Sequence, residues 1–191
     1  MPYFSSSIAH DLITLAESYF PAEYICVVKK KHTYEQSLVG RYLVSKIVEE
    51  HWGISHFLPR VESDGKPLSE YGISWSISHA GDHVFVGVSG NLVWVDIEII
   101  RPRDESLFDT FTTHEWSLLW EKSWKYFYIL WSAKEALVKK YHWWVDEMHG
   151  WQLIWMEVIS ASESTLSFSD GAIREVVTSL LIDGVVRSLS E

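Results

Sequence analysis

The alternating run Leu92–Ile100 constrains the fold more than any other part of the chain. From Val93 to Ile99 every second residue is a branched aliphatic, which predicts a β-strand with one buried face. Asp96 and Glu98 fall on the opposite face, with their side chains roughly 7 Å apart along the strand. The strand therefore presents two carboxylates together on one side.

These two carboxylates allow two interpretations. In the first, they line the solvated side of an edge strand. In the second, they bind a metal ion, because Trp94 shares their face and carboxylates held close at a partly apolar site repel each other without a cation. Oxygen ligands favour Mg²⁺ or Mn²⁺. The spacing alone leaves both open.

The length, composition and net charge of the chain indicate a folded protein and exclude some kinds of binding partner. The 191 residues suit one domain or two small fused halves, and 47% hydrophobic residues are enough for a sizeable core. The net charge of −10 argues against nonspecific binding of nucleic acid or anionic membrane. A single cysteine, Cys26, and the lack of a long apolar run or a signal-peptide pattern predict a cytoplasmic protein.

Eleven tryptophans raise the alternative of a sugar-binding or base-stacking surface. Steps of four, four and seven residues predict one helical stripe formed by Trp116, Trp120, Trp124 and Trp131. Strand parity places Trp151 and Trp155 on one face with Leu153. These spacings favour packing in a core over an aromatic binding surface.

Periodicity, caps and turn residues predict the remaining elements. The expected helices are Ile8–Phe20, Thr33–Trp52 with Gly53 as its C-terminal cap, Glu105–Phe111, and Glu115–Tyr141 with a break near Ser123. The expected strands are Glu23–Val28, Leu58–Glu62, Gly72–Ser78, His83–Ser89, Leu92–Ile100, Trp151–Ile159, Ser164–Ser169 and Ala172–Ile182.

The order of these elements suggests two similar halves. Gly90-Asn91 reads as a two-residue hairpin turn between the strands on either side. Each half then runs strand, helix and three strands, which favours an α+β fold with an N-terminal half at residues 1–91 and a C-terminal half at 92–191. Because no long Gly-, Pro- or Ser-rich segment separates them, we expect one compact unit without a flexible linker.

Two further motifs carry charged side chains. Glu135 and Lys139 lie one helical turn apart, which fits an ordinary surface ion pair. An amphipathic helix that contains Lys134, Glu135, Lys139 and Lys140 would also have a cationic end suited to phosphate. His79 follows a strand at a tight turn, where it is either a surface residue or a donor to phosphate.

In chain order, several motifs resemble those of the surfactin-type 4′-phosphopantetheinyl transferases. They span about residues 33 to 140: Gly40-Arg41, Gly65-Lys66-Pro67, Ser76-Ile77-Ser78-His79-Ala80-Gly81, Val95-Asp96-Ile97-Glu98, Phe111 four residues before Glu115, and Trp131-Ser132-Ala133-Lys134-Glu135-Ala136-Leu137-Val138-Lys139. The resemblance implies two α+β halves related by a pseudo-twofold axis, with coenzyme A bound in the cleft between them. It also implies transfer of 4′-phosphopantetheine from coenzyme A to a serine of an apo acyl or peptidyl carrier protein, with release of adenosine 3′,5′-bisphosphate.

The resemblance also implies roles for individual residues. Asp96, Glu98 and Glu135 would bind Mg²⁺, or Mn²⁺. The serine hydroxyl also needs a proton acceptor, and Glu135 beside the metal is the candidate, directly or through a water. His79 and Lys139 would contact the pyrophosphate and serve catalysis. Arg41 and Lys66 would hold the nucleotide end of coenzyme A. Glu115 matches a further acidic residue of the family, whose role stays open.

The chain departs from the family pattern at two places. Trp94 stands where the family usually has a glycine, two residues before the first metal-binding aspartate, and it is predicted to face the same side as Asp96. The basic residues for the 3′-phosphate of coenzyme A have no secure position, with Lys29-Lys30-Lys31 as the candidate cluster or else a solvated strand end.

Two alternatives to a transferase remain at this stage. Clustered acids with Mg²⁺ also serve a metal-dependent phosphohydrolase, and Trp94 allows a degenerate module that binds coenzyme A or a carrier protein without transfer. The expected transferase is a cytoplasmic monomer that acts on a carrier protein and binds neither nucleic acid nor membrane.

Overall fold

The computed structural model describes residues 3–29, 33–63, 65–141 and 145–190, so Lys30 and Lys31 of the lysine cluster lie outside the described residues. The chain divides into two compact units, Met1–Val93 and Trp94–Glu191. Both combine helices with an antiparallel sheet, which confirms the predicted α+β class. Among the described helices, none has the length and apolar character needed to cross a membrane.

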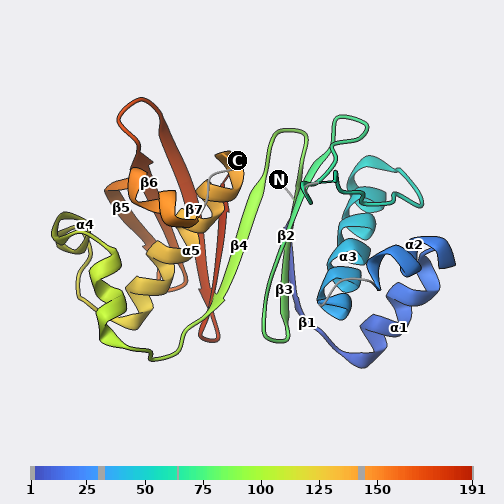
Figure 1. The fold of residues 1–191 in the computed structure, drawn as a ribbon, viewed down its shortest axis with the longest axis horizontal. Helices are drawn as coiled ribbons and strands as arrows, with labels where there is room; N and C mark the ends of the chain where they lie inside the picture. The colour runs from blue at the N-terminus through green and yellow to red at the C-terminus, as the bar shows by residue number, and fades with distance from the viewer. Residues whose placement is uncertain (1–2, 30–32, 64, 142–144, 191) are drawn as a thin grey trace. The chain divides into compact units, whose positions relative to one another are not determined.

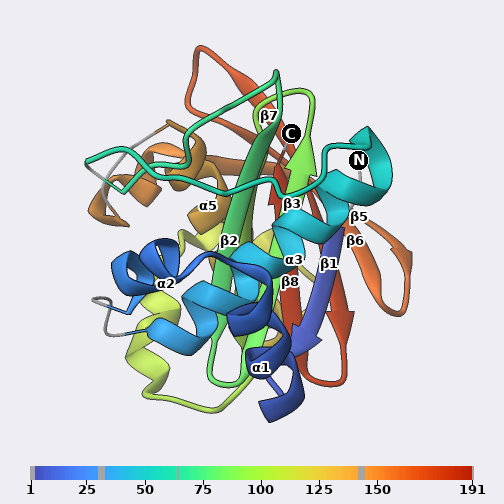
Figure 2. The same cartoon turned by 90° about the vertical axis from the view of Figure 1, so that its right-hand side faces the viewer.

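The first unit is a three-stranded sheet covered by helices. Its elements are β1 (Tyr3–Ser7), α1 (His10–Tyr19), α2 (Ala22–Val28), α3 (Tyr34–Trp52), β2 (Ser74–Ala80) and β3 (His83–Ser89). The strand order is β1-β3-β2, so β3 is central. α3 packs on β3 and β2, and α1 and α2 pack on α3 (Figure 2). The core between α3 and the sheet includes Val44, Val48, Trp75 and Val86.

Two predictions for this unit are confirmed and two are wrong. α3 ends at Gly53, whose φ of 68° is the left-handed conformation of a helix cap, and β3 has the predicted bounds. Residues 23–28 form helix α2 instead of a strand, because helical spacing buries Val28 against α1 and α3 and leaves Val27 exposed. In the predicted strand Leu58–Glu62, only Val61 makes an isolated bridge, to Pro67.

The second unit is a five-stranded sheet covered on one face by a long helix. Its elements are β4 (Trp94–Ile99), η1 (Glu105–Thr110), α4 (Thr113–Ser117), α5 (Trp124–Tyr141), η2 (Val145–Gly150), β5 (Gln152–Ser160), β6 (Glu163–Ser169), β7 (Arg174–Ile182) and β8 (Val185–Ser190). The strand order is β4-β8-β7-β6-β5. Figure 1 shows α5 lying along this sheet, where it packs on β4, β8 and β7.

The predicted hairpin at Gly90-Asn91 is wrong. β3 pairs with β1 on one side and β2 on the other, so it has no free edge for the next strand. β4 pairs instead with β8, a strand that the sequence analysis did not predict. The first unit therefore runs strand, three helices and two strands, and the second ends in four strands, so the predicted shared order of strand, helix and three strands is wrong.

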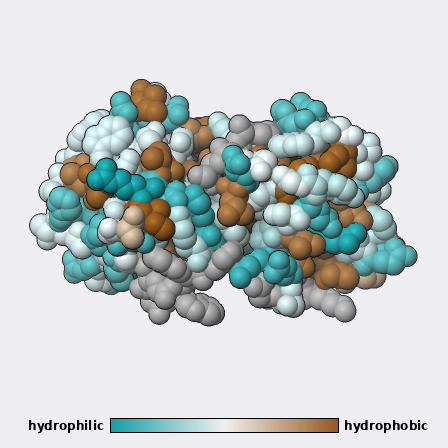
Figure 3. Space-filling view, turned by 90° about the horizontal axis from the view of Figure 1, so that it is seen from above, coloured by the Kyte–Doolittle hydropathy of each residue, from teal (hydrophilic) through white to brown (hydrophobic). Residues whose placement is uncertain are grey.

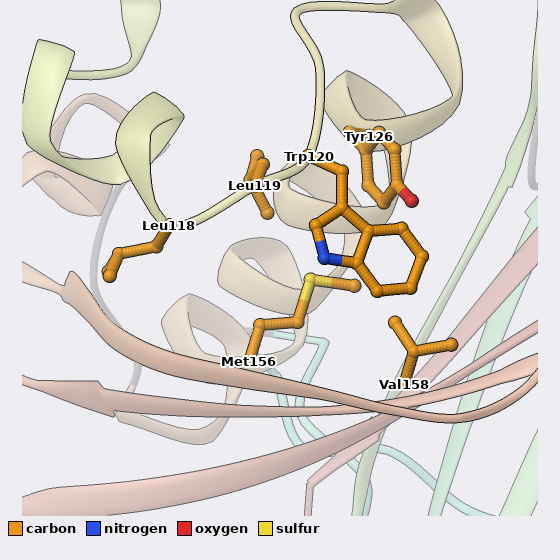
Figure 4. A pocket seen from close by; sticks show the side chains of 6 residues that line it. All are labelled: Leu118, Leu119, Trp120, Tyr126, Met156 and Val158. Carbon is orange, nitrogen blue, oxygen red and sulfur yellow. The ribbon is translucent and has the colours of Figure 1, made fainter.

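The predicted tryptophan stripe is also wrong. α4 ends at Ser117 and α5 begins at Trp124, so Trp116 and Trp120 are not on the same helix as Trp131. Trp120 is 75% exposed and lines a small pocket together with Met156 and Val158 of β5 (Figure 4). On β5 a register shift after Leu153 breaks the parity, which leaves Trp155 exposed while Trp151 is fully buried.

Candidate metal and phosphate site in the second unit

Three carboxylates converge where α5 crosses β4. Alternation along β4 places Asp96 and Glu98 on one face, and Glu135 comes from the middle of α5, which packs on that strand. One ligand oxygen from each of the three acids lies within 4.8 Å of the other two. Asp96 is 2% exposed and the other two are partly buried. The face is therefore not the solvated side of an edge strand.

Lys139 lies one turn after Glu135 and contacts the same acids. Its Nζ lies 2.5 Å from Asp96 Oδ1, 3.8 Å from Glu135 Oε2 and 3.4 Å from the carbonyl oxygen of Val95. About a third of the Lys139 side chain is exposed, whereas Asp96 is buried. The pair that resembled a surface ion pair in the sequence is thus part of a four-residue cluster.

The cluster shifts the ionisation of its members. Burial, together with the negative charge of Asp96, raises the pKa of Glu135 to about 7. Burial and Asp96 also raise the pKa of Glu98. Burial opposes the charge on Lys139, but the carboxylates of Asp96 and Glu135 outweigh it and raise its pKa. Lys139 therefore stays protonated, and Glu135 can gain or lose a proton near neutral pH.

Two arginines beside the cluster were missed by the sequence analysis. Arg101 and Arg103 are exposed and follow β4 directly, and their positive charges oppose the rise in the pKa of Glu98. The signal that could have found them is the Arg-Pro-Arg segment immediately after the acidic strand. They add positive charge beside the three carboxylates.

Glu115 and Lys134 form a separate buried pair. Lys134 Nζ lies 2.5 Å from Glu115 Oε1, and both side chains are 1% exposed. In the described part of the chain the acid cluster holds three carboxylates, and Glu115 is not one of them. The last turn of α5 carries Lys139 and Lys140, as the predicted cationic end requires, but Lys134 is buried and Lys140 lies 2.8 Å from Glu175.

Arg41 is buried within the first unit. It lies on α3, where its guanidinium donates to the Ser37 carbonyl oxygen at 3.1 Å and to Ser37 Oγ at 2.5 Å. The guanidinium carbon also lies 5.9 Å from the centre of the Trp75 ring on β2. These contacts join α3 to the sheet, so Arg41 has a packing role in addition to any role toward a ligand.

Lys66 and His79 lie on other elements of the first unit. Lys66 is partly buried and closes a turn in which the Glu62 N–H donates to its carbonyl oxygen at 2.8 Å; Gly65 supplies the required φ of 90°. His79 is exposed on β2, one residue before the strand ends at Ala80. Of the predicted site residues, the structure thus brings together Asp96, Glu98, Glu135 and Lys139.

Comparison with known proteins points to one family. The sequence model of the 4′-phosphopantetheinyl transferase superfamily matches residues 93–183. The chain is 31% identical over 113 residues to the 4′-phosphopantetheinyl transferase psf-1 of Bacillus pumilus. It is 30% identical over 124 residues to the 4′-phosphopantetheinyl transferase gsp of Aneurinibacillus migulanus. These similarities confirm the resemblance drawn from the motifs.

The alignments cover only part of each protein. They include 54% and 61% of this chain, and 48% and 52% of the two relatives. The chain thus spans about half the length of the curated relatives it matches. The residues matched by the family model include the whole acid cluster and Lys139.

Proposed function

We propose that this chain, whose residues 93–183 match the sequence model of the 4′-phosphopantetheinyl transferase superfamily, transfers 4′-phosphopantetheine from coenzyme A to a serine of an apo acyl or peptidyl carrier protein. The observation that carries the proposal is the cluster of Asp96, Glu98 and Glu135 with a lysine in direct contact. The relatives that bear this activity in their names support it.

The acid cluster fits a divalent cation. It offers three carboxylate oxygens within 4.8 Å of one another, and hard oxygen donors suit Mg²⁺, with Mn²⁺ as the alternative. Asp96 is buried, so its charge needs compensation inside the protein. When bound, the cation would neutralise the phosphate oxygens during transfer.

The residues of the chain supply the remaining chemistry. Glu135, with a pKa raised to about 7 by burial and by Asp96, suits the role of acceptor for the serine hydroxyl proton near neutral pH. The Lys139 ammonium is positioned to donate hydrogen bonds to phosphate oxygens and so to stabilise the departing bisphosphate. Both come from one face of α5, which fixes their spacing.

The resemblance to the family extends the proposal to residues of the first unit, and we add a proposal for the cellular location and the oligomeric state. His79 is proposed to contact the pyrophosphate, and Arg41 and Lys66 the nucleotide end of coenzyme A. The buried contacts of Arg41 make it the least accessible of these three. We further propose that the enzyme is a cytoplasmic monomer, with residues 1–91 and 92–191 as halves of one compact unit.

The test is a transfer assay on several apo carrier proteins. The full chain is incubated with coenzyme A, Mg²⁺ and each carrier, and intact mass spectrometry detects the 4′-phosphopantetheine adduct. We expect Asp96→Ala to abolish the adduct, whereas Asp109→Ala, which removes an 84% exposed carboxylate of the same unit, should leave it unchanged.

Each of the other outcomes contradicts the proposal in a different way. Coenzyme A cleaved without a carrier would identify a phosphohydrolase. Coenzyme A bound without Mg²⁺-dependent transfer would identify a binding module. Full activity of Asp96→Ala would show that this carboxylate is not a cation ligand.

A further inference from the structure

The Lys139 ammonium lies among the carboxylates that would bind a cation, in contact with one oxygen of Asp96 and near one oxygen of Glu135. Its Nζ lies 2.5 Å from Asp96 Oδ1 and 3.8 Å from Glu135 Oε2. One lysine therefore neutralises part of the charge of three carboxylates, and the cluster carries a formal charge of −2 when all four groups are ionised. Without the lysine the charge would be −3.

The Lys139 side chain is more exposed than those of Asp96 and Glu135, the two acids that its ammonium faces. Asp96 is held on a strand that is paired along its length with β8, and its side chain is 3% exposed. The Lys139 side chain is 34% exposed, and its charge lies at the end of a flexible four-carbon stem. Rotation of this stem can move the ammonium away from the acids while α5 stays in place.

We propose that Lys139 is a mobile counterion of the acid cluster, which competes with a divalent cation for Asp96 and Glu135 and turns to the phosphate of the ligand once the cation binds. This inference rests on the cation site of the proposed function. Two positive charges a few ångströms apart repel strongly, so an ammonium on Asp96 Oδ1 opposes a cation on the same carboxylates. A phosphate ligand provides the displaced ammonium with a new partner.

The inference predicts effects of opposite sign in one variant. Lys139→Met should bind Mn²⁺ alone about tenfold more tightly, because the competing charge is gone. The same variant should bind inorganic pyrophosphate in the presence of Mn²⁺ about tenfold more weakly, because it lacks the hydrogen-bond donor. A lysine that only supports the fold would weaken both.

The experiment measures both affinities on the full chain by titration calorimetry under mildly alkaline conditions. Lys139→Met is compared with the wild type and with Lys122→Met. The second variant removes the same charge from an exposed lysine, which lies between α4 and α5 and pairs with Asp109 of η1. We expect Lys122→Met to match the wild type in both titrations. Circular dichroism verifies that each variant is folded.

The outcomes separate this inference from the function on which it rests. If the wild type does not bind Mn²⁺, the cation site and the counterion both fail. If the wild type binds Mn²⁺ but Lys139→Met binds it no more tightly, the counterion inference fails and the cation site stands.

A second measurement applies if Lys139→Met does not fold. In the wild type labelled with ¹⁵N-lysine, the hydrogen-bonded Lys139 ammonium should give a protected NMR signal, assigned by its absence in Lys139→Arg, that disappears on addition of Mg²⁺. The signal of the buried Lys134 should persist. A Lys139 signal that persists at saturating Mg²⁺ would overturn the inference.

Discussion

Glu115 and Lys134 form an ion pair that is sealed from solvent and joins three elements of the second unit. Glu115 Oε1 lies 2.5 Å from Lys134 Nζ and accepts the backbone N–H of Leu153 at 3.2 Å. Its Oε2 accepts the N–H and hydroxyl of Thr112, which completes a capping box at the start of α4. The pair thus ties α4 and β5 to α5 one residue before Glu135.

We expect Glu115→Gln to cost more stability than Lys134→Met. The first change leaves an ammonium buried without a carboxylate, at a cost of about 3–5 kcal/mol. The second leaves a carboxylate that keeps its donors from Thr112 and Leu153, so its cost should be about 2 kcal/mol. Urea denaturation followed by tryptophan fluorescence measures the difference, since nine of the eleven tryptophans lie in residues 94–191.

Lys122→Met is the matched control for the buried pair. Its ammonium lies 3.8 Å from Asp109, and both side chains are largely exposed. Such a pair contributes at most about 1 kcal/mol. Equal losses of stability in Lys122→Met and Lys134→Met would mean that burial does not govern these interactions.

Glu135 should make the stability of the metal-free protein fall as the pH rises. Burial and the charge of Asp96 raise its pKa from 4.5 to about 7 in the folded state. Between these values the folded protein binds more protons than the unfolded chain, so the free energy of unfolding decreases with increasing pH. The loss across this window is up to about 3 kcal/mol.

The measurement compares the wild type with Glu135→Gln in the presence of EDTA. Denaturant unfolding at a series of pH values from about 4.5 to 8 gives both profiles. The variant has no carboxyl group to titrate, so its profile should be flatter and it should be the more stable protein at the alkaline end. Parallel profiles would show that Glu135 ionises with its ordinary pKa.

The alternation of residues in the sequence correctly predicted that Asp96 and Glu98 share one face, because in a regular strand every second side chain lies on the same side. β4 is paired with β8 without a bulge, so Asp96 and Glu98 fall on the face that the sequence predicts. For Trp155 the parity of the sequence predicts the wrong face. A register shift in β5, which the local sequence does not predict, turns its side chain outward. Parity in a sequence is therefore informative only as far as the pairing is regular.

The predictions that failed depend on distant parts of the chain. Residues 23–28 carry branched and aromatic residues typical of a strand, but Val28 is buried only in the helix that packs on α3. The burial of Lys134 depends on Glu115, nineteen residues earlier, and on the N–H of Leu153. Tertiary packing decides these cases.

Gly40 is required by the close approach of α3 to β2. A Cβ added at this position would lie 2.6 Å from Cγ2 of Ile77. Although alanine favours a helix by about 1 kcal/mol over glycine, overpacking costs about 1–3 kcal/mol, so we expect Gly40→Ala to lower the melting temperature. In the background of Ile77→Ala, which removes Cγ2, the same change should be neutral or stabilising. An equal loss in both backgrounds would contradict this contact.

Trp120 and Trp151 should differ sharply in their contributions to stability, although the sequence assigned both to the core. Trp151 is fully buried among residues that include Leu153 and Phe168, so Trp151→Ala should cost about 3–5 kcal/mol. Trp120 is 75% exposed, although it lines the pocket with Met156 and Val158, so Trp120→Ala should cost less than about 1 kcal/mol. Thermal unfolding by circular dichroism compares the two variants with the wild type. Exposed hydrophobic residues are common on protein surfaces, and Figure 3 shows several separate groups of them among hydrophilic residues. Exposure of Trp120 is therefore no sign of a special role. A large loss of stability in Trp120→Ala would show that this indole packs more tightly than its exposure indicates.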